Sequence, residues 1–501
     1  MKDKKIAAIL TAGVIILCSS LAACGGDKAG GNAPDYSKSN AEYPIWAYSG
    51  TRGDWYEEND YRYYYEDGSR LTAENTALYA ECGFNVLFAD WSIGGYDGPV
   101  GFENSEMKKA LDYSADCGLK AFVYTKQLAW LSQTEESLIN PEKAKMPENK
   151  DKFFETEADL NAYVAEYLAP LKEHPAFYGC SLKDEPKYTM LEAMGQVYRA
   201  IQATAPDCFV NMNLNPMYEG TEYMYCPEGN SIGVVKGYKK YLESYYQHIG
   251  QYSKYIQYDD YPILEGGAVL GYHLHNAQIV AEFCQEKGMT FGKVFQTCAY
   301  NAGLVRESTT KTDMLWQMNI GMAMGIKNYS YFTYYPRGWY PREDWRDNAF
   351  IVDLEGKPTQ RYYWLQDLHQ EMQFNAKALM NFEYQALNIL TKTPIPGNKS
   401  FLQGALNASE KLTGVKSITM DSAGVLLTTE QYDEANDQRG YYVMNATAPS
   451  QATEIKVTLQ LEKGKNNVQI WDGNKVVNKA AKNGKISFYL TTGEGVFVLP
   501  Y

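Results

Sequence analysis

Two adjacent acids, Asp184 and Glu185, stand where an apolar stretch meets a proline, in the segment Phe177-Tyr178-Gly179-Cys180-Ser181-Leu182-Lys183-Asp184-Glu185-Pro186. Pro186 blocks further strand pairing and favours an extended Glu185, so we expect both acids at the exit of a strand. A sheltered carboxyl beside a second acid has a raised pKa, which suits a general acid for cleavage of a glycosidic bond. The alternative is that one of these acids only caps the helix that follows.

A second acidic pair lies in the segment Tyr258-Asp259-Asp260-Tyr261-Pro262, at the end of another strand candidate. We expect one of Asp259 and Asp260 to take part in the site, and the other to point into solvent in a turn before Pro262. The aspartate in the site would supply a second carboxylate, as nucleophile or as base, according to the separation of the two carboxyl groups. Its carboxyl should then lie within about 10 Å of the Glu185 carboxyl.

The elements that must position these acids form a repeated pattern of strand and helix from Ile45 to about Asn381. Eight β-branched or aromatic runs are predicted as strands: Ile45–Gly50, Phe84–Trp91, Leu119–Thr125, Phe177–Lys183, Cys208–Asn213, Tyr255–Asp260, Lys293–Cys298 and Asn328–Thr333. Amphipathic stretches between and after them are predicted as helices: Thr72–Glu81, Asn104–Cys117, Thr156–Glu173, Met190–Thr204, Tyr238–Gly250, Asn276–Lys287, Thr310–Met324 and Gln360–Met380. Four helices are expected to end at a left-handed glycine, namely Gly83, Gly118, Gly288 and Gly325.

Eight strands each followed by a helix predict a (β/α)8 TIM barrel of the α/β class, over residues 43–390. A doubly wound open sheet shares the alternation, but no glycine-rich phosphate loop follows any strand. From about residue 395 the pattern changes to alternating strands without helices, which predicts an all-β sandwich domain over residues 391–501. Two long connections, 126–154 and 335–359, are predicted as loops, and the second carries Trp339, Tyr340 and Trp345 as candidates for a wall of a cleft.

Side chains at or near the C-terminal ends of the predicted strands are candidates for substrate binding, because barrel sites form there. Six are aromatic: Trp46, Trp91, Tyr124, Tyr258, Tyr331 and Tyr334. Flat rings with a polar edge suit the faces of sugars, and we expect about a third of the six to line a cleft. Four are polar and suited to hydroxyl groups: Arg52, Asp90, Asn213 and Gln296.

Charge and cysteine content exclude several classes of partner. The net charge of −14 disfavours nucleic acid and anionic membrane surfaces and leaves neutral substrates open. The expected partner is a carbohydrate substrate, on the evidence of the strand-end residues. Seven cysteines follow Cys24 without CxxC or CxxH spacing, and only His273 and His275 lie close together among the five histidines. We therefore expect no metal and no other cofactor.

The first 24 residues are predicted to be a signal peptide, because lysines precede an apolar run too short to span a bilayer. The segment Leu21-Ala22-Ala23-Cys24-Gly25 resembles the lipobox of bacterial lipoproteins, which implies lipidation at Cys24. Residues 25–42 are polar and small, so we expect a flexible tether. We expect the protein on the extracellular face of the bacterial cell membrane, with the lipid anchor as its only contact with the membrane. The alternative is an ordinary cleaved signal with an incidental cysteine.

The pattern Y-G-x-x-L-x-D-E-P around Glu185 resembles the fourth strand of barrel glycoside hydrolases in the large retaining superfamily that includes family 42 β-galactosidases. The resemblance covers residues 43 to about 381 and implies that Glu185 is the catalytic acid/base. It also implies a glutamate nucleophile on the seventh strand, where this chain has Val294-Phe295-Gln296-Thr297. A glutamine cannot form the glycosyl ester that the ordinary two-carboxylate retaining mechanism requires.

Three interpretations accommodate Gln296. In the first, Asp259 or Asp260 supplies the second carboxylate. In the second, Asp184 and Glu185 resemble the acidic pair of substrate-assisted hexosaminidases, in which the 2-acetamido oxygen of the substrate attacks, the first acid orients it and the second protonates the leaving group. In the third, the chain is a carbohydrate-binding lipoprotein without turnover. A structural surface protein with a decayed barrel is a further class, and it predicts no soluble sugar ligand.

Overall fold

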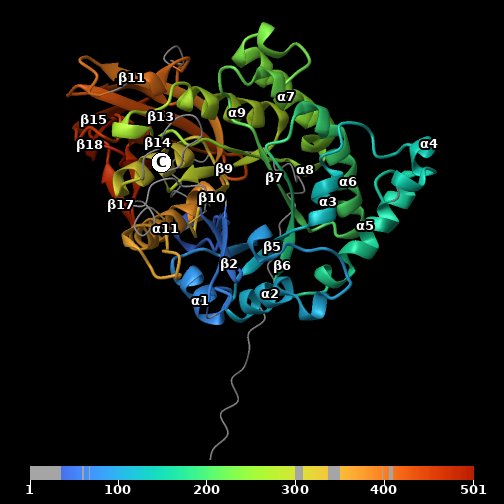
Figure 1. Cartoon of the computed structure of the whole chain (residues 1–501). Coiled ribbons are helices and arrows are strands. Elements are labelled where there is room, and N and C mark those ends of the chain that lie inside the picture. Colours follow the sequence, from blue (N-terminus) through green and yellow to red (C-terminus); the bar gives the residue numbers. More distant parts are fainter. Residues whose placement is uncertain are drawn as a thin grey trace, which may run out of the picture.

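A computed structural model describes residues 35–58, 61–66, 68–149, 151–298, 309–336, 350–397, 399–405 and 410–501. Eight parallel strands form one sheet in the order β1-β10-β9-β8-β7-β6-β5-β4 (Figure 1). They are β1 (Ile45–Ala47), β4 (Val86–Ala89), β5 (Lys120–Tyr124), β6 (Phe177–Asp184), β7 (Phe209–Leu214), β8 (Tyr255–Asp259), β9 (Thr290–Gln296) and β10 (Asn328–Phe332). Each overlaps one predicted run, and the predicted (β/α)8 barrel is confirmed.

The barrel closes between β1 and β4 through the side chain of Asn85, the residue just before β4. The backbone N–H of Asn85 donates to the Ile45 carbonyl at 3.1 Å, and its side-chain oxygen accepts from the Ile45 N–H at 2.7 Å. Its side-chain amide donates to the Tyr43 carbonyl at 2.9 Å. This one amide therefore satisfies backbone groups that a regular ladder would otherwise pair.

Helices follow the barrel strands in chain order. They are α1 (Ala73–Glu81), α2 (Glu106–Asp116), α3 (Lys126–Leu131), α4 (Pro141–Ala144), α5 (Glu157–Lys172), α6 (Leu191–Thr204), α7 (Val234–Tyr245), α8 (Gln251–Ser253), α9 (His273–Lys287), α10 (Lys311–Ala323) and α11 (Gln360–Leu379). Capping boxes begin two of them, formed by Thr156 with Asp159 and by Thr310 with Asp313. The four glycines predicted at helix ends all have positive φ, between 61° and 95°.

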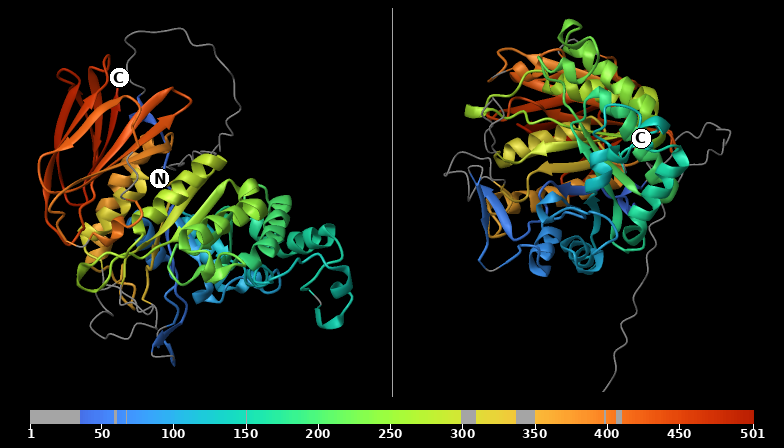
Figure 2. Two further views of the ribbon diagram at one scale, coloured as in Figure 1. Left: turned by 90° about the horizontal axis from the view of Figure 1, so that it is seen from above. Right: turned by 45° about the vertical axis from the view of Figure 1, so that its right-hand side comes forward.

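Two local features differ from the prediction. A hairpin of β2 (Trp55–Glu58) and β3 (Tyr61–Tyr64) follows β1 and was not expected. The connection 126–154 is not a plain loop, because it contains α3 and α4, and Figure 2 shows α4 in an arm that extends from the barrel. Helix α3 is only six residues long, and it is stabilised by burial of Leu128 and Leu131 rather than by its own length.

The C-terminal part is a β-sandwich, as predicted. One sheet has six strands in the order β11 (Glu383–Lys392), β13 (Gly424–Asp433), β14 (Gln438–Asn445), β19 (Gly495–Pro500), β16 (Asn467–Asp472) and β17 (Lys475–Ala480). The other has β12 (Val415–Met420), β15 (Glu454–Leu461) and β18 (Lys485–Thr491). The structure places the first sandwich strand at Glu383, earlier than the expected boundary at residue 391. Strands β11, β12 and β17 were not predicted.

The sandwich packs against the side of the barrel through α10 (Figure 2). The Trp316 indole donates to the Ala446 carbonyl at 3.3 Å. The Asn319 amide donates to the Gly493 carbonyl at 2.6 Å and accepts from the Tyr442 hydroxyl at 2.5 Å. Since these polar groups are buried and paired, they fix the position of the sandwich on the barrel.

Aromatic rings fill the interior of the barrel. Trp46 packs against Phe122 with ring centroids 4.7 Å apart, and Phe88 stacks on Phe122 at 4.5 Å. Val294 and Phe332 belong to the same buried cluster. The interior of the barrel is therefore a packed core, as is usual for this fold.

Several N-terminal and loop predictions fall outside the described residues. These are the signal peptide, Cys24, most of the tether, and the aromatic residues Trp339, Tyr340 and Trp345. Within the described part of the chain, no helix combines the length and the apolar character needed to cross a bilayer.

Candidate active site

Glu185 lies directly after β6, and its backbone is held in an unusual conformation. Its φ is 48°, in the left-handed region, whereas the proline that follows predicted an extended residue. The Glu185 N–H donates to the Asn213 carbonyl at 2.8 Å. The Pro186 carbonyl accepts from the Asn215 amide at 3.1 Å and from the Tyr241 hydroxyl. These bonds from neighbouring elements offset the cost of a conformation that glutamate rarely adopts.

The helical segment after β6 is not capped by either acid. It starts with a short 3-10 turn at Tyr188 and continues as α6, and the residues at the two cap positions, Lys187 and Met190, make no side-chain capping bond. The interpretation of Asp184 or Glu185 as a helix cap is therefore wrong. Both carboxylates are left at the mouth of the barrel.

Asp259, the last residue of β8, brings a second carboxyl to Glu185. It is 6% exposed, and a hydrogen bond joins its side chain to that of Glu185. Its Oδ1 is buried without a hydrogen-bond partner among the described residues. Burial, followed by the charges of Glu185 and Asp184, raises the pKa of Asp259 well above its usual range. These surroundings favour the protonated form of Asp259, which can donate to the Glu185 carboxylate.

The same surroundings make Glu185 a group that titrates near neutrality. Loss of water around the carboxyl, followed by repulsion from Asp184, raises the pKa of Glu185 to about 7. Lys183 and the hydrogen bond with Asp259 act in the opposite direction. The residue as a whole is exposed, so the carboxyl is crowded by protein atoms yet remains open to a ligand. An acid of this kind can give a proton at neutral pH and take it back.

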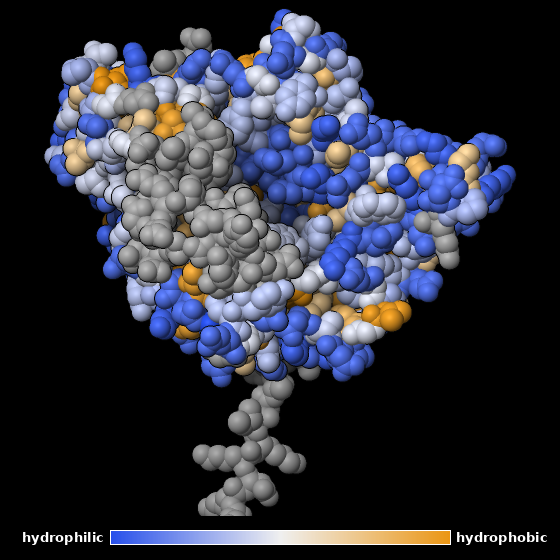
Figure 3. Space-filling view, in the orientation of Figure 1, coloured by the Kyte–Doolittle hydropathy of each residue, from blue (hydrophilic) through white to orange (hydrophobic). Residues whose placement is uncertain are grey.

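A cavity of about 160 Å³ lies at the C-terminal ends of the first five barrel strands; Asp184 lines it, and Glu185 is the next residue in the chain. Its lining is aromatic and polar, with Tyr48, Phe88, Trp91, Tyr124, Ala129, Gln133, Ser181, Leu182, Lys183, Asp184, Asn211 and Asn213. The face of the molecule in the orientation of Figure 1 is hollowed over the middle of the barrel, and the visible wall of the hollow is mostly hydrophilic (Figure 3). Such a lining suits a ligand with hydroxyl groups and flat apolar faces.

Asp184 is fixed against this cavity by residues from two other strands. The Asn213 amide donates to its Oδ1 at 3.0 Å, and the Tyr48 hydroxyl lies 3.5 Å from the same oxygen. The side-chain oxygens of Asn211 and Asn213 are buried without partners among the described residues. Unsatisfied buried acceptors next to a cavity are suited to hydroxyl or amide donors of a ligand.

Asp260 does not share the site, and the expectation that one aspartate of this pair points into solvent is wrong. It is 2% exposed and lies on the outer face of the sheet, where it pairs with His273 of α9. The Lys293 ammonium is 3.9 Å from its Oδ2. Burial lowers the pKa of Lys293 to about 8, although Asp260 and Asp259 oppose this shift. Successive strand residues face opposite sides of the sheet, so the side chains of Asp259 and Asp260 point in opposite directions.

Two of the six aromatic candidates, Trp91 and Tyr124, line the cavity. Trp46 lies deeper in the barrel interior, where its indole donates to Asn328 at 3.1 Å. The other three do not reach the cavity, because their side chains belong to the core that packs outside the barrel sheet: Tyr258, Tyr331 and Tyr334. Their assignment to substrate binding is corrected accordingly.

Three of the four polar candidates are engaged in holding the protein backbone. The Asp90 carboxylate accepts from the Ser92 N–H at 2.8 Å and from a second backbone N–H. Arg52 is buried and donates to the Pro336 carbonyl. The Gln296 amide donates to the Ile263 carbonyl at 3.1 Å and accepts from its N–H at 2.8 Å. Only Asn213 lines the cavity.

Several residues of the cavity were not predicted from the sequence. Tyr48, two residues after Trp46, occupies the place expected for Trp46, and alternation along β1 carries its ring to the barrel mouth. Ala129 and Gln133 come from α3 and the turn after it, a segment taken for a plain loop. Knowledge of the inward face of each strand would have identified Tyr48, whereas α3 had no clear local signal.

No cluster of three histidines, cysteines or acids that could hold a metal ion occurs in the described ranges. His273 and His275, the one close pair in the sequence, separate: His273 pairs with Asp260, whereas His275 lies against Gly404.

No known family model matches the sequence, and no curated protein matches it. Among solved structures it is similar to a family 5 glycoside hydrolase from Bacteroides vulgatus, with 11% identity, 91% of this chain and 88% of that chain covered, and a TM-score of 0.45. It is similar to an α-amylase from Anoxybacillus, with 10% identity, 92% of this chain and 97% of that chain covered, and a TM-score of 0.44. It is also similar to a family 39 glycoside hydrolase from Bacteroides cellulosilyticus, with 11% identity, 86% of this chain and 78% of that chain covered, and a TM-score of 0.42.

Proposed function

We propose that this protein is a glycoside hydrolase in which Glu185 protonates the leaving oxygen. The observation that carries the proposal is a carboxyl with a pKa of about 7, placed at the C-terminal end of the fourth barrel strand beside an aromatic and polar cavity. Barrel active sites form at this end of the strands. A general acid works best when its pKa is near the operating pH.

The geometry does not favour a mechanism with two catalytic carboxylates. Retaining enzymes separate the two carboxyls by about 5 Å, and inverting enzymes by about 6.5 to 9.5 Å, so that a sugar or a water fits between them. Here Asp259 and Glu185 are joined by a hydrogen bond, which leaves no such space. Gln296, at the nucleophile position implied by the resemblance, has its side-chain amide bonded to the backbone of Ile263. We assign Asp259 the task of tuning Glu185.

A substrate-assisted mechanism needs no protein nucleophile and fits the residues that remain. We propose a substrate with a 2-acetamido group, whose carbonyl oxygen attacks C1 as the glycosidic bond breaks. Glu185 gives its proton to the departing oxygen, and Asp184 accepts a hydrogen bond from the acetamido N–H. Water then attacks C1, the bond between C1 and the acetamido oxygen breaks and restores the acetamido group, and the Glu185 carboxylate takes a proton from the water. Asp184 suits its role because Asn213 fixes it against the cavity.

A panel of aryl glycosides tests the proposal, with matched 2-acetamido and 2-hydroxy sugars of the gluco and galacto series. We expect turnover of a 2-acetamido substrate, loss of turnover in Glu185→Gln, and inhibition by a thiazoline that mimics the cyclised intermediate. Turnover of 2-hydroxy sugars at equal rate would exclude substrate assistance but keep the hydrolase. Absence of turnover with every substrate would reject the hydrolase.

A carbohydrate-binding protein without turnover is the second candidate, and the observation that favours it is Gln296 in place of a nucleophile. The two candidates differ in one measurement. Calorimetry with the sugars of the panel would show binding in both cases, whereas hydrolysis accompanies it only in the enzyme.

We also propose that the protein is carried on the outer face of the bacterial membrane by a lipid on Cys24. The support is the lipobox-like segment Leu21–Gly25. Expression in a bacterial host fed labelled palmitate tests it. Label should enter the wild type and be absent from Cys24→Ser, and unlabelled wild type would contradict the proposal.

A further inference from the structure

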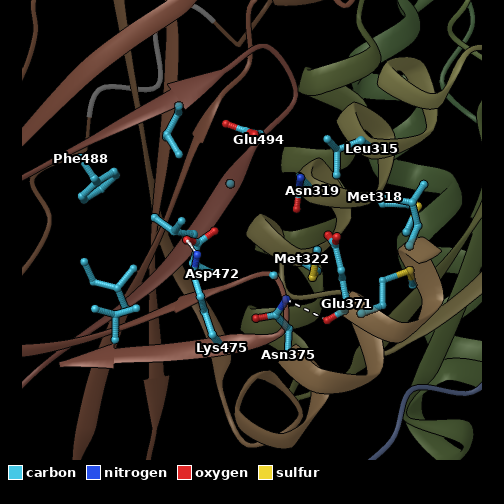
Figure 4. A pocket seen from close by; sticks show the side chains of 18 of the residues that line it. Leu315, Met318, Asn319, Met322, Glu371, Asn375, Asp472, Lys475, Phe488 and Glu494 are labelled. Atoms are coloured by element: carbon cyan, nitrogen blue, oxygen red, sulfur yellow. Dashed lines mark hydrogen bonds and ion pairs between the residues drawn. The ribbon is translucent and has the colours of Figure 1, made fainter. Parts of the chain in front are cut away.

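A second and larger cavity, of about 430 Å³, lies between the barrel and the sandwich. Helices α10 and α11 form one wall, and residues from β16 to β19 with their turns form the other (Figure 4). Its volume falls in the range of small-molecule sites, which often occur where two domains meet. None of its residues belongs to the candidate active site.

The wall of this cavity is partly apolar. The barrel side contributes Met318, Met322 and Met372, and the sandwich side contributes Phe488, Leu490 and Val496. Methionine adapts its shape to different ligands, and an aromatic ring attracts a cation over its face. A carbon skeleton that carries a positive charge would be suited to such a wall.

Three carboxylates and three lysines line the cavity: Glu371, Asp472 and Glu494, and Lys311, Lys475 and Lys479. Two of the three carboxylates have partners. Asp472 forms an ion pair with Lys475 at 3.2 Å, and Glu494 accepts from the Thr491 N–H at 2.7 Å. Glu371 is half-buried; its backbone carbonyl accepts from the Asn375 amide, whereas its carboxylate makes no hydrogen bond or ion pair with any residue that the structure describes. Its carboxylate points from α11 toward Asn319 of α10 (Figure 4). Burial raises the pKa of Glu371, Lys311 opposes this shift, and the charges of Asp367, Asp472 and Glu494 add to it.

A metal ion does not fit this arrangement. No three acids in the described residues approach closely enough to hold one ion, so these carboxylates are spread around the space instead of converging on a point. Lys311, the lysine that opposes the pKa shift of Glu371, is itself engaged by Asp367 at 2.9 Å. An unpaired half-buried carboxylate is costly, and an ammonium group in hydrogen-bond contact would relieve that cost.

We propose that the interdomain cavity binds a small organic ammonium ion, with its nitrogen on Glu371 and its carbon body against the methionines and Phe488. The turn between β16 and β17 lies close to the Glu371 carboxylate. A Cβ added at Gly473 would lie 3.8 Å from the Glu371 carboxyl carbon. This inference does not depend on the proposed function.

Calorimetric titration of the full-length protein with cyclohexylamine at neutral pH tests the proposal, with cyclohexanol as the uncharged analogue. We expect the amine to bind with a dissociation constant on the order of 1 mM, and the alcohol to bind at least about tenfold more weakly. Glu371→Gln should weaken the amine about tenfold or more. Glu286→Gln, at a carboxylate that is 71% exposed on α9, should leave the affinity unchanged.

Further variants separate this site from the active site and from misfolding. Glu185→Gln should bind the amine as the wild type does. Met322→Trp, which fills the cavity and retains Glu371, should also abolish binding, and thermal unfolding checks that each variant is folded. Equal affinity in folded Glu371→Gln, equal affinity for cyclohexanol, or no binding of the amine would each overturn the proposal.

Discussion

The pKa of Glu185 leads to a specific pH dependence of activity. If Glu185 is the general acid, turnover requires its protonated form. With a pKa of about 7, the protonated fraction is about 90% at pH 6 and about 10% at pH 8. An ordinary glutamate with a pKa of 4.5 would be only about 3% protonated at pH 6. We therefore expect kcat/KM to fall about tenfold between pH 6 and pH 8, with little change below pH 6.

The assay measures kcat/KM from about pH 5 to about pH 9 on the best aryl glycoside of the panel. At pH 6 the kcat/KM of Glu185→Gln should be about 10²- to 10⁴-fold lower than that of the wild type, and its pH profile should lack the fall above pH 7. The loss should be smaller for substrates with highly acidic leaving groups, because those need little protonation. Glu192→Gln makes the same change at an exposed position of α6, and it should keep both the rate and the profile.

Two results would refute this reasoning. One is a wild-type profile without a limb between pH 6 and pH 8. The other is a Glu185→Gln enzyme that keeps that limb with a merely reduced rate, because the titrating group would then be another residue. Unfolding of the protein over the same pH range must be excluded by circular dichroism, since it would mimic the limb.

Three further predictions concern the electrostatics and the packing of the barrel. Asp184→Asn removes a negative charge that raises the pKa of Glu185, so the alkaline limb of the kcat/KM profile should move to lower pH. A limb at the wild-type pH would contradict this role of Asp184. Burial lowers the pKa of His369 to about 4, so the folded state resists its protonation, and stability present above pH 6.5 is lost as the pH falls toward 4. Between pH 6.5 and pH 4 the wild type should lose about 3 kcal/mol more of its free energy of unfolding than His369→Gln does, as measured by urea unfolding at both pH values. Equal losses in the two proteins would contradict this prediction. Gly179→Ala should lower the free energy of unfolding by about 3 kcal/mol or more, because the added Cβ would lie 1.8 Å from a backbone oxygen of β7. The control is Gly237→Ala in α7, where the added Cβ meets only ordinary contacts. It should be neutral or slightly stabilising in thermal unfolding.

The sequence by itself determined the order of strands and helices, the barrel and the sandwich. Each barrel strand is a short apolar run, and most of the long helices, though not α6, have a cap or a terminal glycine that acts within a few residues, so these signals are local. The position of Glu185 at a strand exit was also local, because Pro186 ends the pairing of β6. Short elements such as α3 and the β2–β3 hairpin were missed because their stability depends on what covers them.

Only the tertiary structure decided which side chains meet. Strands of a parallel barrel are apolar on both faces, so their hydrophobic pattern does not reveal which residues point inward. For that reason Tyr258 and Tyr331 were assigned to the site although they face the helices, and Tyr48 was overlooked. The choice between Asp259 and Asp260 has the same origin. The hydrogen bond between Glu185 and Asp259 joins residues 74 positions apart, and the shared burial that raises both pKa values exists only once β6 and β8 stand in one barrel.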